Sequence, residues 1–260
     1  MNDFLSEDWR AVFEYNDMKS FQDFWEYEAE WFEEPNVRRG GWSGVMRVVL
    51  ESPDDTERVI FLKRQENHVT KTIWYPFRGK MTFEIEMKAI QQLRACNIPT
   101  LKPLYFAQRT IDGDRRSILI TAELKDYISL EDLTHEWDDK GWPSVAERKR
   151  IIISVANVLR EMHKHKLQHN CFYAKHVLLK FVDNDIDVRI IDLEKVKRRC
   201  LRTTATIRDL YTLSRHLGSW SATDRLRFLL VYMQIPRLNP VARKVWKKIA
   251  RRTVRKESAI

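Results

Sequence analysis

The sequence predicts an α+β protein with a strand-rich first half and a helical second half. Short β-branched runs separated by turn residues precede residue 124, whereas apolar stripes with helical spacing follow it. With 260 residues, of which 43% are hydrophobic, the chain can build two packed lobes. We place the lobes at 1–124 and 125–260 of one domain and expect a cleft between them.

The first half alternates strand pairs with a helix. Its aromatic and acidic stretch at 17–32 predicts a helix or a covering segment. The turn residues 52–55 and 112–114 each separate two apolar runs, which is typical of hairpins. In order, the expected elements are strands at 45–51 and 59–64, a helix at 81–95, and strands at 105–110 and 117–122.

The second half is mainly helical. One apolar stripe runs through Ile152, Val155, Ala156, Leu159 and Met162, which is typical of a helix packed on one face. In order, the expected elements are helices at 129–137 and 146–165, strands at 177–181 and 188–191, and helices at 206–217, 224–233 and 241–254.

Composition excludes several classes of protein. No apolar stretch reaches the roughly 18–20 residues of a membrane-spanning helix. Residues 1–10 carry acids and lack a signal-peptide pattern, so we expect a cytoplasmic protein. The three cysteines, Cys96, Cys171 and Cys200, have no metal-type spacing, which argues against a disulfide framework or a zinc site.

A set of residues in a particular order points to phosphate chemistry. Asp192 follows a buried strand, where a carboxylate can ligate Mg²⁺. Lys63 closes an apolar strand, and Glu86 lies on the following helix, where it could hold the lysine toward phosphates. Glu84, two residues earlier, remains an alternative partner. A strand lysine, a helix glutamate, a His-containing loop and a strand aspartate follow one another as in protein-kinase-like folds.

Several segments carry a closer resemblance. They are WFEEPNVRRGGWSGV at 31–45, FLKRQ at 61–65, YPF at 75–77, CFY at 171–173 in the loop that ends at His176, DLEK at 192–195 and RDL at 208–210. Through them the chain resembles the lipopolysaccharide kinase (Kdo/WaaP) family, most closely its weak-acid-inducible InaA branch. The resemblance covers about residues 30–235 and implies a protein-kinase-like two-lobe fold.

The resemblance also implies roles for individual residues, with ATP and Mg²⁺ as cofactors. Gly40, Gly41 and Gly44 take the place of the Gly-rich loop over the ATP phosphates, although their spacing differs from GxGxxG. The phosphate-binding pair is then Lys63 with Glu86. The other implied roles are adenine contact through the backbone at Glu123, metal binding at Asp192, and support of the catalytic-loop backbone at Asp209.

The catalytic loop departs from the family pattern. Kinases have His-Arg-Asp there, whereas this chain has His169-Asn170-Cys171, so the position of the catalytic base is Cys171. His176 stands where a second metal ligand is usual, and imidazole suits Mg²⁺ poorly. Glu194 could replace the base or hold a second metal. We therefore expect Lys63, Cys171 and Asp192 at the catalytic centre, with metal contacts from Asp192, His176 and Glu194.

Basic residues suggest an anionic partner. The net charge is +9, and a basic cluster follows the metal aspartate at Lys195, Lys197, Arg198, Arg199 and Arg202. We expect these side chains to hold an anionic glycan or a lipopolysaccharide precursor. The helix expected at 241–254 has a cationic face that either contacts the inner membrane peripherally or is simply solvated.

Three hypotheses for the function follow. The first is a kinase that phosphorylates a sugar of lipopolysaccharide core or a related glycan. The second is a pseudokinase that binds nucleotide or acts as a scaffold in envelope or weak-acid stress, which Cys171 favours. The third, nucleic-acid binding, rests on charge alone, and we do not expect it.

Overall fold

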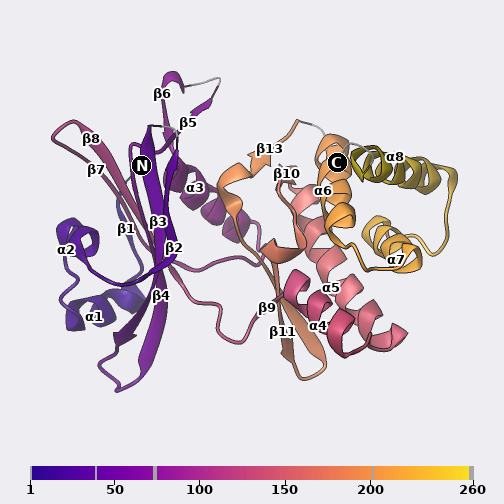
Figure 1. The fold of residues 1–260 in the computed structure, drawn as a ribbon, viewed down its shortest axis with the longest axis horizontal. Coiled ribbons are helices and arrows are strands. Elements are labelled where there is room, and N and C mark those ends of the chain that lie inside the picture. Colours follow the sequence, from indigo (N-terminus) through magenta and orange to yellow (C-terminus); the bar gives the residue numbers. More distant parts are fainter. Residues whose placement is uncertain (1, 39, 73–74, 201, 258–260) are drawn as a thin grey trace. The chain divides into compact units, whose positions relative to one another are not determined.

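The computed structural model describes the backbone of residues 2–38, 40–72, 75–200 and 202–257. The side chains of 72, 75–76, 202–205 and 251–257 are outside the described set. The chain forms two compact units (Figure 1). Unit 1 comprises Met1–Gln91 and Leu101–Lys125, and unit 2 comprises Gln92–Thr100 and Asp126–Ile260.

Unit 1 contains an antiparallel sheet of six strands in the order β1-β7-β8-β4-β3-β2. A separate hairpin, β5–β6, precedes α3. The elements are β1 (Phe4–Leu5), α1 (Glu7–Tyr15), α2 (Phe21–Glu26), β2 (Trp31–Arg38), β3 (Gly41–Glu51), β4 (Glu57–Glu66), β5 (Val69–Thr72), β6 (Tyr75–Met81), α3 (Thr82–Ala95), β7 (Pro103–Ile111) and β8 (Asp114–Ala122).

Helices cover both faces of this sheet. On one face lie α1 and α2 (Figure 1), and the buried core there includes Phe13, Phe24 and Leu62. Side chains alternate along a strand, so Lys63 points to the opposite face, where α3 lies. Residues Val45 and Leu119 are the register partners of Lys63 on the neighbouring strands.

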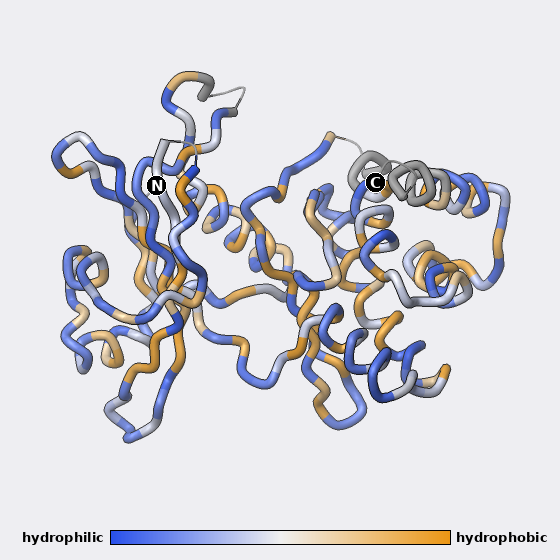
Figure 2. The backbone as a smooth tube through the Cα atoms, viewed as in Figure 1, coloured by the Kyte–Doolittle hydropathy of each residue, from blue (hydrophilic) through white to orange (hydrophobic). Residues whose placement is uncertain are grey.

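Unit 2 is mainly helical and has small sheets at its edge. Its longest helix, α5, begins with a capping box between Ser144 and Glu147 and buries the predicted apolar stripe. Apolar residues of α5 and β11 stand out along the tube in Figure 2. The elements are β9 (Ile128–Ser129), α4 (Leu130–Lys140), α5 (Val145–Lys164), β10 (Leu167–Gln168), η1 (Ala174–His176), β11 (Val177–Val182), β12 (Asp185–Ile190), η2 (Leu193–Lys195), β13 (Lys197–Arg198), α6 (Arg202–His216), α7 (Ala222–Met233) and α8 (Pro240–Glu257).

The predicted α+β class, strand-rich first and helical second, is confirmed. The stretch 17–32, expected to be a helix or a covering segment, contains the short helix α2 (Phe21–Glu26), which packs on the sheet, and β2 begins at Trp31. The sequence reading also missed α1, which is amphipathic and buries Trp9, Val12 and Phe13. Among the described residues, no helix is long and apolar enough to cross a membrane.

Candidate functional site

The best-defined polar contact in unit 1 joins β4 to α3. Lys63 Nζ donates to Glu86 Oε1 at 2.7 Å, and the two side chains are only 18% and 6% exposed. The alternative partner, Glu84, instead pairs with Lys88 and lies 3.8 Å from Lys80 Nζ. Burial opposes ionisation of Glu84, but these lysines hold the pKa of its carboxyl below the usual range. The structure therefore resolves the alternative in favour of Glu86.

The glycines expected to form a loop lie mostly in a strand. Gly40 occupies the turn between β2 and β3 with φ +79°, a conformation that glycine adopts without strain. Gly41 and Gly44 belong to β3. A Cβ on Gly41 would meet Glu66 O at 2.0 Å, and one on Gly44 would meet the Trp31 ring at 2.5 Å. Both glycines thus have packing reasons, and the expected loop is a strand hairpin.

The residue expected to contact adenine is already engaged on one side. Glu123 N donates to Val59 O at 3.0 Å, and the Glu123 carboxylate accepts from Arg47 Nε at 2.8 Å. The Glu123 N–H is therefore used in the pairing of β8 with β4, so any adenine contact must use the Glu123 carbonyl or the backbone groups that follow it.

In unit 2, one buried carboxylate organises the catalytic-loop segment. Asp209 on α6 accepts from His169 N at 2.7 Å and from Asn170 N at 2.9 Å. It also contacts His163 Nε2 at 3.0 Å, while His163 Nδ1 lies 2.8 Å from the Tyr232 hydroxyl. The side chains of Asp209 and His163 are fully buried. Asp209 thus supports the loop backbone, and Asn170 is held in the left-handed region at φ +68°.

Hydrogen bonds define the tautomers of the two loop histidines. The N–H of Cys171 donates to His169 Nδ1 at 3.3 Å, so His169 Nε2–H donates to Ile191 O at 2.9 Å. Burial lowers the pKa of His169, which favours this neutral form. His176 Nδ1 lies 2.9 Å from the carbonyl of Cys171 and must be the donor there.

His176 and Asp192 together present two metal-ligand atoms. Because His176 Nδ1 donates, its Nε2 faces Asp192 Oδ2 at 3.3 Å. Asp192 adopts a left-handed backbone at φ +58° directly after Ile191, whose N–H donates to His176 O. No cluster of three or more His, Cys, Asp or Glu side chains suited to a metal occurs among the described residues. The Asp192 carboxylate is the kind of ligand that a hard divalent cation prefers, whereas the His176 nitrogen suits Mg²⁺ poorly, so such a cation would take most of its ligands from phosphate and water.

Cys171 is buried, with only 6% of its surface exposed. Burial and the neighbouring Cys171 raise the pKa of Tyr173. Burial alone would lower the pKa of Lys195, but the nearby Cys171 and Glu194 outweigh it and raise that pKa. The base position is therefore a buried thiol with a tyrosine and a lysine as neighbours.

The remaining site residues expected from the sequence, Glu194 and the basic cluster at 195–202, differ in their exposure and contacts. Glu194 Oε1 lies 3.3 Å from Lys195 Nζ. Lys195, Lys197 and Arg198 are exposed, whereas Arg199 donates to the buried Gln168 at 2.5 Å. Arg199 is thereby committed to the β10–β13 contact, and the side chain of Arg202 lies outside the described residues.

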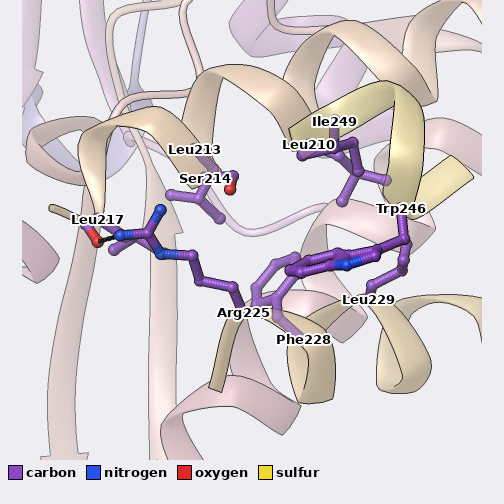
Figure 3. A pocket seen from close by; sticks show the side chains of 9 residues that line it. All are labelled: Leu210, Leu213, Ser214, Leu217, Arg225, Phe228, Leu229, Trp246 and Ile249. Carbon is purple, nitrogen blue, oxygen red and sulfur yellow. Dashed lines mark hydrogen bonds between the residues drawn. The ribbon is translucent and has the colours of Figure 1, made fainter. Parts of the chain in front are cut away.

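Unit 2 also contains an apolar recess between α6, α7 and α8 (Figure 3). Its volume of about 20 Å³ accommodates little more than one water molecule. Arg225 lies at its edge and donates to Leu217 O at 2.8 Å, which ties the end of α6 to α7. The recess has no chemistry-bearing cluster and serves packing.

Sequence reasoning missed the chain of buried groups behind Asp209. Tyr232 lies far from the loop in sequence, whereas His163 lies only six residues before His169; both occupy ordinary positions of amphipathic helices. Tyr173 was part of a matching segment but received no role of its own. The contacts of His163 with Asp209 and with Tyr232 had no signal in the local sequence, because both depend on how α5, α6 and α7 pack.

Comparisons with known proteins identify a family that matches most of the chain. The model of the lipopolysaccharide kinase (Kdo/WaaP) family matches residues 22–232. Protein InaA of Escherichia coli K12 is 29% identical over 197 residues, which cover 76% of this chain and 88% of InaA.

The lipopolysaccharide core heptose(I) kinase WaaP is a further relative. The E. coli and Pseudomonas aeruginosa proteins are 30% and 27% identical to this chain, and each match covers 58% of it. The chain spans about 60% of the length of these kinases. A solved structure of WaaP in complex with acyl carrier protein has a TM-score of 0.71, with 20% identity over 100% of this chain and 99% of that one, and shares the fold.

Proposed function

The chain belongs to the lipopolysaccharide kinase (Kdo/WaaP) family, and we propose that it is an ATP-dependent phosphotransferase. The proposed acceptor is a sugar of lipopolysaccharide core or a related glycan, reached at the cytoplasmic face of the inner membrane. One observation carries this proposal: a lysine and a glutamate in the positions the family implies form a nearly buried ion pair at 2.7 Å. Such a pair fixes an ammonium group where phosphates can be bound.

The other roles follow from unit 2. Asp192 and His176 would hold a divalent cation, with Mg²⁺ as the ion that kinases ordinarily use. When bound, such a cation neutralises charge that develops on the transferred phosphoryl group. The exposed Lys195, Lys197 and Arg198 would bind the anionic acceptor, because ammonium and guanidinium groups pair with phosphate and carboxylate.

Catalysis without an aspartate at the base position is physically reasonable. Phosphoryl transfer has a loose transition state, so positioning and charge neutralisation supply most of the rate. General-base help is worth about 10²–10⁴-fold. The buried thiol of Cys171 is a weak acceptor, and Glu194, two residues after Asp192, is the carboxylate that could take its place. We therefore expect a slow kinase.

The second candidate function is a pseudokinase that binds nucleotide and acts as a scaffold in envelope or weak-acid stress. The buried thiol at position 171 favours this alternative, because a thiol accepts hydrogen bonds more weakly than the carboxylate that kinases have there. The two functions share nucleotide binding and differ in turnover.

Calorimetry with ATP and Mg²⁺ tests the shared step. Glu86→Gln removes the charge that holds Lys63, so we expect nucleotide affinity to fall at least about tenfold, the effect of losing one charge-assisted hydrogen bond. Glu84→Gln is the matched control: it makes the same change on the same helix but does not contact Lys63, and it should leave affinity nearly unchanged.

Turnover with purified lipopolysaccharide core then separates the candidates. ATP hydrolysis or transfer that is lost in Asp192→Ala supports the kinase. Binding without turnover supports the pseudokinase. If the wild-type protein binds no nucleotide, both functions are wrong and only the fold is shared with the family.

A further inference from the structure

A second polar pocket lies in unit 1, apart from the Lys63–Glu86 pair. It is formed by the end of the β7–β8 hairpin, by β6 and by the start of α3, and its volume is about 360 Å³. The charged side chains of its lining are five cations and one acid: Arg78, Lys80, Arg109, Arg115, Arg116 and Glu84. Neither Lys63 nor Glu86 lines it, so the proposed nucleotide contacts do not account for its charge.

Two of these cations are held in place by acids outside the pocket. Arg109 donates to both carboxylate oxygens of Asp3, and Arg116 pairs with Glu66 at 2.7 Å. Arg116 also lies over the Trp25 ring, with 5.0 Å to its centroid. Ion pairs and stacking of this kind restrain a guanidinium group without filling all five of its donors.

The other two arginines lack such compensation. Arg115 Nη1 donates to the carbonyl of Arg78 at 2.8 Å, which orients the guanidinium with a neutral group. Within the part of the chain that the structure describes, neither Arg78 nor Arg115 forms an ion pair with a carboxylate. The pocket therefore has positive charge in excess, with one planar donor group already oriented.

The wall that carries Arg115 is firmly built. Asn67, directly after β4, accepts from Arg115 N at 2.9 Å and donates to Asp114 at 2.8 Å, while its own N–H bonds to Arg115 O. Three hydrogen bonds from one residue thus fix the end of β8. A preorganised arginine loses little freedom when it binds an anion.

An exposed aromatic residue precedes the pocket residue Arg78 on β6. Phe77 is 91% exposed and is not part of the pocket lining. Single exposed phenylalanines are common on protein surfaces, but an aromatic residue next to an arginine in the chain is also typical of surfaces that contact the headgroup region of a bilayer.

We propose that this pocket binds the phosphate group of an anionic ligand, with Arg78 and Arg115 as its main contacts. Arginine presents paired donors that match phosphate oxygens. The phosphate is that of a phospholipid headgroup or of a free phosphate compound, and Phe77 distinguishes the two sources. This site is independent of the proposed kinase activity, since no residue is shared.

Binding to two probes tests the proposal on the full chain. The first probe is vesicles of phosphatidylglycerol and phosphatidylcholine, with phosphatidylcholine alone for comparison, followed by co-sedimentation. The second is inorganic pyrophosphate, followed by calorimetry. The variant is Arg78→Ala/Arg115→Ala. The control is Lys140→Ala/Lys149→Ala, which removes the same charge from exposed positions of α4 and α5.

The expected loss for the pocket variant is about thirtyfold on the vesicles, from ~1 kcal/mol per basic side chain near an anionic surface. Wild-type binding that falls in this way, and falls less in the control, supports the proposal. Loss of vesicle binding in Phe77→Ser with pyrophosphate binding intact identifies the headgroup as source. Pyrophosphate binding that depends on the two arginines, without vesicle binding, identifies a free phosphate compound.

Three results overturn the proposal. The first is that wild-type protein binds neither probe. The second is that the pocket variant binds both probes as tightly as wild type. The third is that the control variant loses as much affinity as the pocket variant. If the double variant fails to fold, Arg78→Ala alone decides the outcome, because it leaves the carbonyl that orients Arg115 in place.

Discussion

Asp209→Asn is the most informative single change in unit 2. The carboxylate accepts three buried hydrogen bonds, from His169 N at 2.7 Å, Asn170 N at 2.9 Å and His163 Nε2 at 3.0 Å. An amide of nearly the same shape has one acceptor oxygen. In either orientation its NH₂ group meets at least one backbone N–H, donor against donor.

The cost follows from these contacts. A hydrogen bond to a charged group contributes about 1.5–3 kcal/mol, and a buried donor left without a partner costs about 1–3 kcal/mol more. We therefore expect Asp209→Asn to lower the free energy of unfolding by about 3–5 kcal/mol. At about 2–4 °C per kcal/mol for a chain of this size, the Tm falls by roughly 10 °C.

Urea unfolding and a thermal scan measure the effect, and amide hydrogen exchange locates it. Exchange should accelerate at His169 and Asn170, the two backbone donors. Asp187→Asn is the control, because its bonds to Arg189 and Tyr127 are one-third exposed and should contribute about 1 kcal/mol or less. If Asp209→Asn is no more destabilising than Asp187→Asn, the assignment of Asp209 as the support of the loop is refuted.

Two further predictions concern pH and packing. Burial lowers the pKa of His169, so below the unfolded value near 6.5 only the unfolded chain gains this proton. The free energy of unfolding should therefore fall between pH 7 and 5, and more steeply in wild type and in the exposed-site control His135→Gln than in His169→Gln. Equal slopes would contradict the buried neutral ring. Gly44→Ala should lower the free energy of unfolding by about 1–3 kcal/mol, because its Cβ would lie 2.5 Å from the Trp31 ring. The control Gly218→Ala, with open space around its Cβ, should leave the free energy of unfolding unchanged. Equal urea midpoints for the two variants would refute the prediction.

The sequence predicted most elements because their signals are local. The apolar stripe of α5 recurs every three or four residues, and the β7–β8 turn contains Asp112 and Gly113 at positive φ. Boundaries agree within a few residues for these elements. The stretch 17–32 was left open between a helix and a covering segment, because its aromatic residues belong to a short helix and then to an edge strand, and tertiary packing decides between them.

The candidate site divides in the same way. Residue identity and order were sufficient to name Lys63, Asp192 and His176. They were insufficient to choose Glu86 over Glu84, since both lie on α3 two residues apart and only the direction of each side chain separates them. The family resemblance implied a Gly-rich loop at Gly40, Gly41 and Gly44, and only the structure shows that Gly40 forms the β2–β3 turn while Gly41 and Gly44 lie in β3.

By itself the sequence determined the class of fold, the family resemblance and the absence of a carboxylate at Cys171. Only the tertiary structure decided that Asp209 gathers His169, Asn170 and His163, and that arginines from β6 and β8 line one pocket. The physical reason is that periodicity and turn chemistry act within about ten residues, whereas a hydrogen bond or a charged pocket depends on side chains that packing brings together from distant positions.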